Sequence, residues 1–96
     1  MNELLPIGSL VILENISKPV MILSYLPEHK GRVFDYLGVF YPVGLVSNKS
    51  AMIFNQSGIE KLIVKGYEDE DCRKFLPTIP LAVSEMIAEA EAKKGE

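Results

Sequence analysis

Short hydrophobic runs separated by turn residues make up the first two thirds of the chain, and this pattern predicts β-strands. The runs occupy residues 9–14, 20–26, 33–41, 51–54 and 62–66. The first run, SLVILE, is apolar at most of its odd and its even positions, and so is the second, VMILSYL. Strands of this kind bury both faces, so we expect cover on both sides of the sheet.

Turn residues connect these runs. Residues 27–32, PEHKGR, combine a proline and a glycine with three charges, which predicts an exposed hairpin loop. Pro42 and Gly44 are expected to end the third run in a turn. Residues 55–61 favour a short helical turn over a direct hairpin connection into the fifth strand.

The third run contains half of the chain's eight aromatic rings, in the stretch FDYLGVFYPVG. As one strand over 33–41, it places Phe34, Tyr36 and Phe40 on one face and Tyr41 on the other. Neither face is polar enough for solvent, so one is expected to meet the core and the other a helix or another chain. The pattern favours a core strand and leaves open a partly exposed aromatic patch that binds a protein partner.

The hydrophobic period changes after Gly66. The acidic stretch EDED, residues 68–71, precedes Arg73 and Lys74, a charge order that favours a helix, which Pro77 is expected to end. Pro80 suits the first turn of a second helix. The apolar face of that helix has the spacing i, i+3, i+4, i+7 and consists of Val83, Met86, Ile87 and Ala90.

These elements predict one α+β domain over residues 1–96. Its body, residues 1–67, is expected to be a small, bent antiparallel sheet of about five strands, similar to a partial SH3-like barrel. Two helices follow in the acidic segment of residues 68–96.

Charge is unevenly distributed along the chain. Residues 1–67 contain six basic and five acidic residues, a net charge of +1, whereas residues 68–96 contain four basic and eight acidic residues, a net charge of -4. A near-neutral body with an acidic tail has no field that attracts phosphate groups. We therefore expect no nucleic-acid partner.

The hydropathy pattern also bears on location. The longest apolar runs are far shorter than the eighteen or so residues that a membrane-spanning helix needs, and the N-terminus lacks the basic and small-residue features of a signal peptide. The single cysteine, Cys72, can form no internal disulfide, which agrees with a reducing compartment. These features predict a cytoplasmic protein that does not insert into membranes.

Candidate catalytic chemistry is sparse. His29, the only histidine, lies in the charged hairpin loop without a partner to orient it, and Cys72 lies in an acidic helix where carboxylates oppose thiolate formation. The EDED stretch lacks the ligand spacing of a calcium loop and is typical of a helix start. We expect no enzymatic activity, no metal and no cofactor.

The candidate partner-binding residues are aromatic, turn-forming or acidic, namely Phe34, Tyr36, Phe40, Tyr41, Pro42, Tyr67, Asp69 and Asp71.

Several motifs resemble those of a small Gram-positive bacterial family catalogued as domain of unknown function 4176. They are LPIGSLVIL, KPVMILSYL, DYLGVFYPVG and IFNQSGIEKLIVKGY, followed by the acidic EDED and Phe75. The resemblance covers roughly residues 4–75. It implies a protein encoded beside LXG toxins and type VII secretion genes, and no catalytic residues come with it.

The resemblance implies a non-enzymatic cytoplasmic accessory protein, a chaperone or adaptor that helps an LXG toxin or its targeting factor reach the type VII secretion machine. The expected partner is that protein, with self-association as an addition. Two alternatives stay open. One is an immunity protein whose acidic tail contacts a basic toxin, and the other is a small ligand-binding barrel or enzyme with a pocket lined by Tyr36, Tyr41 and Tyr67.

Overall fold

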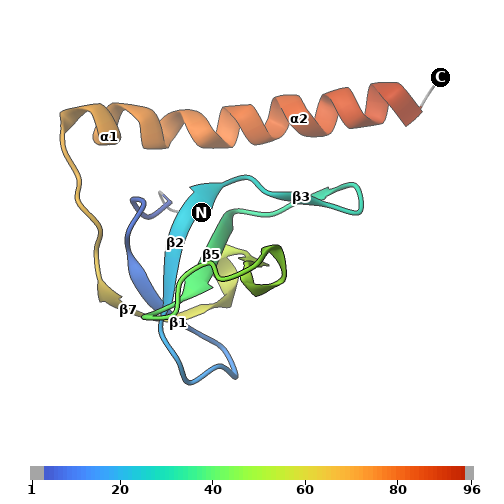
Figure 1. Ribbon diagram of the computed structural model, residues 1–96. Helices are drawn as coiled ribbons and strands as arrows, with labels where there is room; N and C mark the ends of the chain where they lie inside the picture. Colours follow the sequence, from blue (N-terminus) through green and yellow to red (C-terminus); the bar gives the residue numbers. More distant parts are fainter. Residues whose placement is uncertain (1–3, 95–96) are drawn as a thin grey trace.

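The body of the protein is an open, antiparallel sheet with the strand order β6-β5-β2-β1-β7 (Figure 1). The computed structural model describes residues 4–94, without the side chains of residues 48, 86, 87 and 90–94. The strands of the sheet are β1 (Leu10–Leu13), β2 (Val20–Tyr25), β5 (Tyr36–Phe40), β6 (Met52–Phe54) and β7 (Ile59–Val64). This arrangement, with helices after the sheet, confirms the predicted α+β class and strand number.

A separate hairpin of β3 (Glu28–His29) and β4 (Arg32–Val33) extends from the end of β2. It confirms the exposed hairpin predicted from PEHKGR. Two short 3₁₀ helices, η1 (Asn48–Ser50) and η2 (Gln56–Gly58), precede and follow β6. The second is the helical turn that the sequence favours between the last two strands.

The prediction of one strand over residues 33–41 is wrong, because the chain bends before β5 begins. The Asp35 carboxylate accepts a hydrogen bond from the Gln56 amide at 2.8 Å, and the Asp35 amide donates to the Asn55 side chain at 3.0 Å. The Phe34 amide instead donates to the Pro27 carbonyl at 2.9 Å, within the hairpin. Phe34 therefore does not lie on the face of β5 that carries Tyr36.

The first α-helix ends at Phe75, two residues before Pro77, and Pro80 lies in the first turn of the second α-helix, both as predicted, but the chain between them stays helical. α1 (Glu70–Phe75), η3 (Leu76–Thr78) and α2 (Ile79–Lys94) follow without a break and run as one rod along one side of the sheet (Figure 1). Proline is accepted where its missing amide is not needed, in the first turn of a helical element, and Pro77 is the second residue of η3. Of the apolar face predicted for this helix, Val83 packs against the core, while Met86, Ile87 and Ala90 lie outside the described side chains.

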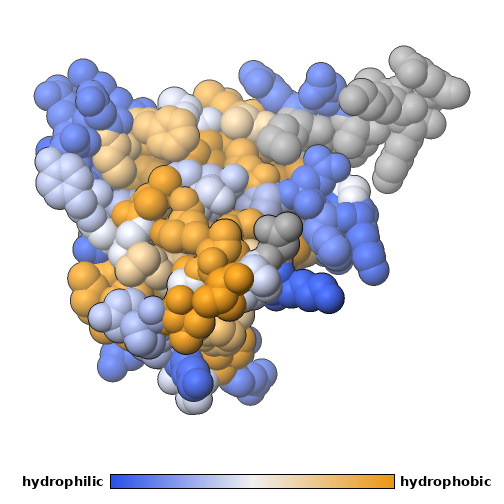
Figure 2. Space-filling view, in the orientation of Figure 1, coloured by the Kyte–Doolittle hydropathy of each residue, from blue (hydrophilic) through white to orange (hydrophobic). Residues whose placement is uncertain are grey.

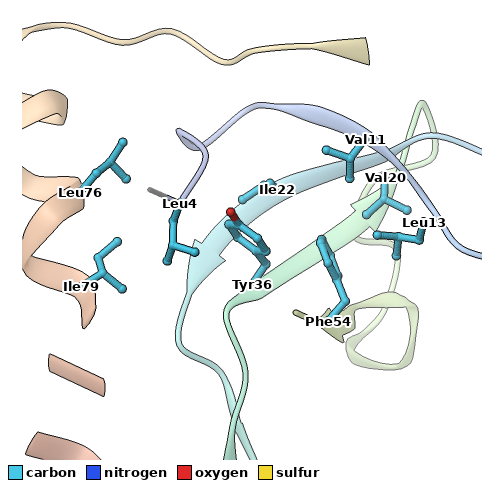
Figure 3. Close-up of a cluster of buried hydrophobic side chains, with 9 residues drawn as sticks. All are labelled: Leu4, Val11, Leu13, Val20, Ile22, Tyr36, Phe54, Leu76 and Ile79. Atoms are coloured by element: carbon cyan, nitrogen blue, oxygen red, sulfur yellow. The ribbon is translucent and has the colours of Figure 1, made fainter. Parts of the chain in front are cut away.

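One face of the sheet and the start of the helical segment enclose the hydrophobic core. Figure 3 shows Leu4 between the helical residues Leu76 and Ile79 and the sheet residues Ile22 and Tyr36. The rest of this cluster comes from the three strands β1, β2 and β6 and consists of Val11, Leu13, Val20 and Phe54. The N-terminal segment therefore forms the layer that joins helix to sheet.

The opposite sheet face is also apolar but less deeply covered. Leu10, Ile12, Met21 and Leu23 alternate with the core residues of β1 and β2 and are half-buried. The two-sided hydrophobicity of these strands thus corresponds to one fully buried face and one half-buried face.

Ser9 ties the N-terminal segment to the end of β7. Its hydroxyl donates to the Pro6 carbonyl at 2.7 Å and accepts from the Gly66 amide at 2.9 Å. Ser9 itself is fully buried. This contact sets the point from which the chain leaves the sheet toward α1.

Candidate protein-binding surface

The structure separates the eight predicted partner-binding residues into three places. Tyr36 lies in the core, and its sequence neighbours Phe34 and Phe40 are half-buried. Tyr41 and Pro42 are exposed in the loop after β5, and the three remaining residues, Tyr67, Asp69 and Asp71, lie at the junction of β7 and α1. They do not form one continuous site.

Tyr36 is a structural residue. Its side chain is fully buried, and its ring lies 5.3 Å from that of Phe54 and 6.0 Å from that of Tyr25. Its hydroxyl accepts from the Leu5 amide at 2.8 Å and donates to the Gln56 side-chain oxygen. A partner has no access to this side chain, which is part of the core.

Removing this hydroxyl is expected to destabilise the fold. Tyr36→Phe leaves the Leu5 amide and the Gln56 side chain without this partner in a partly buried place, which costs about 1–3 kcal/mol. Urea unfolding measures the change. Tyr41→Phe is the matched control, because Tyr41 is 49% exposed, and we expect a change below about 0.5 kcal/mol there. Equal effects at the two positions would contradict the role of the Tyr36 hydroxyl.

Alkaline pH offers a second test of this cluster. Burial raises the pKa of Tyr36 to about 12, as it does that of Tyr25, where Cys72 and Tyr36 add to the effect. Because the neutral phenol is favoured in the folded state, this stabilisation is complete below the ordinary tyrosine pKa of 10.0 and is lost as the pH rises toward 12. The free energy of unfolding, measured against pH in this window, should fall less steeply in Tyr36→Phe than in the unmodified protein. Identical slopes would argue against a buried, neutral Tyr36.

A concave apolar surface lies where the helical segment meets the N-terminal segment. It has a volume of about 350 Å³ and is lined by Ile7, Tyr25, Tyr67, Cys72 and Phe75. We call it the aromatic groove. Tyr25, one of its less exposed lining residues, has its ring 6.0 Å from that of Phe75, and its hydroxyl donates to the Leu5 carbonyl at 2.5 Å.

Local chain geometry places the walls of the aromatic groove. The Asp69 carboxylate caps α1 by accepting a hydrogen bond from the Cys72 amide at 2.9 Å. This cap agrees with the helix start predicted from the acidic stretch EDED. Cys72 and Phe75 are three residues apart in this helix and therefore lie on the same side of it. Tyr67, in the extended link before the cap, is 81% exposed.

The carboxylates beside the aromatic groove differ in their partners. Glu68 lies 3.4 Å from Lys65 and 3.9 Å from Arg73, and Lys74 pairs with Glu70 at 3.3 Å. Asp71 is exposed and takes part in none of the ion pairs found among the described residues. All three cations of this region are thus engaged, while one carboxylate next to Cys72 is not.

A second apolar surface lies on the loop between β5 and η1. Tyr41, Val43, Leu45 and Val46 are each 49–72% exposed, and Figure 2 shows a broad hydrophobic area on this side of the molecule. The surface contains the predicted Tyr41 and Pro42. Single exposed apolar residues are ordinary, but a group of this kind is typical of an interaction surface.

The edge strand β7 also exposes apolar side chains, those of Leu62, Ile63 and Val64. It pairs with β1 through two register irregularities and carries Glu60 and Lys61. Bulges and charges on an edge strand hinder pairing with another sheet. This edge is therefore a weaker candidate for partner binding than the aromatic groove.

The alternative pocket of Tyr36, Tyr41 and Tyr67 does not form. Tyr36 begins β5 and Tyr41 directly follows its end, so a strand length of about 17 Å separates them. Tyr67 instead joins Tyr25, Ile7 and Phe75 in the aromatic groove. The sequence reasoning missed these three partners, because they lie far apart in the chain and no local pattern connects them.

The described residues contain no group of three or more histidine, cysteine or acidic side chains suited to a metal ion. His29 is exposed in the β3–β4 hairpin and Cys72 is half-buried in α1, both as predicted. None of the helices within residues 4–94 combines the length and the apolar character needed to cross a membrane.

Comparison with known proteins places the chain in a family. The family model described as domain of unknown function, DUF4176, matches residues 4–75. The chain belongs to the DUF4176 family. The matched part of this DUF4176 protein includes the sheet, α1 and all residues of the aromatic groove, while η3 and α2 lie beyond it. Searches of curated proteins and of solved structures gave no match.

Proposed function

We propose that this DUF4176 protein is a non-enzymatic chaperone or adaptor that binds an LXG toxin, or its targeting factor, in the cytoplasm and assists its export by type VII secretion. The aromatic groove is the observation that carries the binding part of this proposal. The link to LXG toxins rests on the family resemblance of the sequence.

The composition of the aromatic groove suits protein binding. Aromatic side chains are enriched at the centres of protein interfaces, where they supply most of the binding energy. Tyr67 and Phe75 are 81% and 51% exposed beside the more buried Tyr25, so the protein presents aromatic area that no described residue covers. Tyr25 is held in place by its hydrogen bond to Leu5 and its ring contacts, which lowers the entropy lost on binding.

Co-expression with the toxin encoded beside this protein, followed by affinity purification, tests the proposal. We expect the two proteins to purify together, and we expect export of the toxin to fall when this protein is deleted. Absence of a complex together with unchanged export would refute the role in secretion.

The immunity alternative is favoured by one feature, the acidic residues around the start of α1. Growth of cells that express the toxin domain separates the two functions. An export chaperone leaves sister cells sensitive to the active toxin, whereas an immunity protein protects them, so protection without an effect on export would replace the leading proposal.

A further inference from the structure

We propose that the aromatic groove binds a large apolar side chain of the partner whose neighbouring residues are lysine or arginine. This inference deepens the proposed function and rests on it for the assignment of the aromatic groove as the partner site. It adds the chemistry by which a partner segment is recognised.

The shape of the aromatic groove indicates an anchor residue. A volume of about 350 Å³ is at the lower end for small-molecule pockets, and its lining residues are apolar or aromatic. The Tyr25 hydroxyl is already engaged, because it donates to the Leu5 carbonyl. The groove thus offers contact area to a side chain such as leucine, phenylalanine or tryptophan, with little hydrogen bonding to select a polar ligand.

The charges at the rim of the groove indicate the charge of the partner residues next to that anchor. Lys65, Arg73 and Lys74 are held in the ion pairs with Glu68 and Glu70, while the exposed Asp71 carboxylate follows the acidic cap. Residues 68–89, whose side chains are described except at 86 and 87, contain six carboxylates and two basic residues, a net charge of -4, so the wider field along this side is negative as well. A basic segment is attracted to such a rim and an acidic segment is repelled.

The loop surface at Val43 and Val46 lacks an acidic rim. Its neighbours Lys49 and Ser47 add no carboxylate, so charge does not distinguish among its partners. The aromatic groove is therefore the surface for which the structure specifies a partner's chemistry.

Two matched peptides test this inference without the toxin. The chain contains no tryptophan, so the fluorescence of a short peptide with a single tryptophan reports on the peptide alone. One peptide flanks this residue with lysines and the other with glutamates. We expect saturable binding of the lysine peptide, about two- to fivefold tighter than that of the glutamate peptide, because one exposed ion pair contributes little. The difference should shrink at high salt.

Variants assign this binding to the groove. Tyr67→Ser should weaken both peptides about tenfold or more, and Asp71→Asn should reduce the preference for lysine. Glu60→Gln, an exposed carboxylate on β7, is the matched control and should keep that preference. Equal affinity of the two peptides, no binding of either, or full binding by Tyr67→Ser would overturn the inference.

The peptide result and the toxin result are separable. If toxin capture depends on Tyr67 but the peptides show no preference for lysine, the proposed function stands and the basic segment is wrong. If the lysine peptide binds at the groove but no toxin complex forms, the recognition chemistry stands and the proposed partner is wrong.

Discussion

Leu76→Ala is expected to lower the free energy of unfolding by about 3 kcal/mol, within the range measured for leucine truncation in well-packed cores. Leu76 is 1% exposed and joins Leu4 and Ile79 where the helical segment meets the sheet (Figure 3). The truncation removes apolar contacts and leaves a cavity between these layers. Urea or thermal unfolding measures the change.

Leu81→Ala is the matched control for this variant. Leu81 belongs to the same helical segment, five residues further along, but is 68% exposed. We expect a change below about 0.5 kcal/mol. Similar losses in both variants would mean that the helical segment does not pack on the sheet through Leu76.

Gly66→Ala is expected to destabilise the protein by about 1–3 kcal/mol or more, as overpacking does elsewhere. A Cβ atom at position 66 would lie 2.2 Å from the Ile7 carbonyl oxygen and 2.9 Å from the Ser9 amide nitrogen. Both are backbone atoms, so the N-terminal segment or the end of β7 must shift. The hydrogen bond from the Gly66 amide to the Ser9 hydroxyl is lengthened by either movement.

Gly58→Ala controls for the general effect of replacing a glycine. A Cβ atom at Gly58 meets nothing within 4 Å, so we expect a change of less than about 1 kcal/mol, with a small gain from the lower entropy of the unfolded chain. The close approach at Gly66 would be contradicted if Gly66→Ala unfolded at the same urea concentration as Gly58→Ala. Because Tyr67 is the next residue, Gly66→Ala is also expected to disturb the aromatic groove.

The strands of the sheet were predictable because their hydrophobic runs are short and bounded by turn residues. The break in the third strand before Tyr36 was not predictable. It depends on Asp35, whose hydrogen-bond partners, Asn55 and Gln56, are some twenty residues away in the sequence. Pro77 correctly predicts the end of α1, but not the helical turn that follows, because its position in the first turn of η3 removes the penalty that proline carries in a helix interior. Such errors arise where tertiary contacts or the position in an element decide what a residue does.

The candidate site was predictable only in part. The aromatic or acidic character of Tyr67, Asp69 and Asp71 predicts them as partner-binding residues, and the structure places Tyr67 in the aromatic groove and Asp69 at the helix cap beside it. The same aromatic character predicts Tyr36, which is a core residue. Composition cannot distinguish these two tyrosines, because their burial depends on how β5 and α1 pack in three dimensions.

The affinity of the toxin for Tyr67→Ser, compared with Tyr41→Ser, tests the aromatic groove as the partner site. Both tyrosines are exposed, at 81% and 49%, so neither substitution should unfold the protein. Tyr67 lines the groove, whereas Tyr41 lies in the loop after β5. Isothermal titration calorimetry should show a loss of about thirtyfold for Tyr67→Ser, the size expected for an aromatic hot spot, and little change for Tyr41→Ser. Unchanged affinity of Tyr67→Ser, with a loss in Tyr41→Ser, would contradict the proposal and move the partner site to the loop.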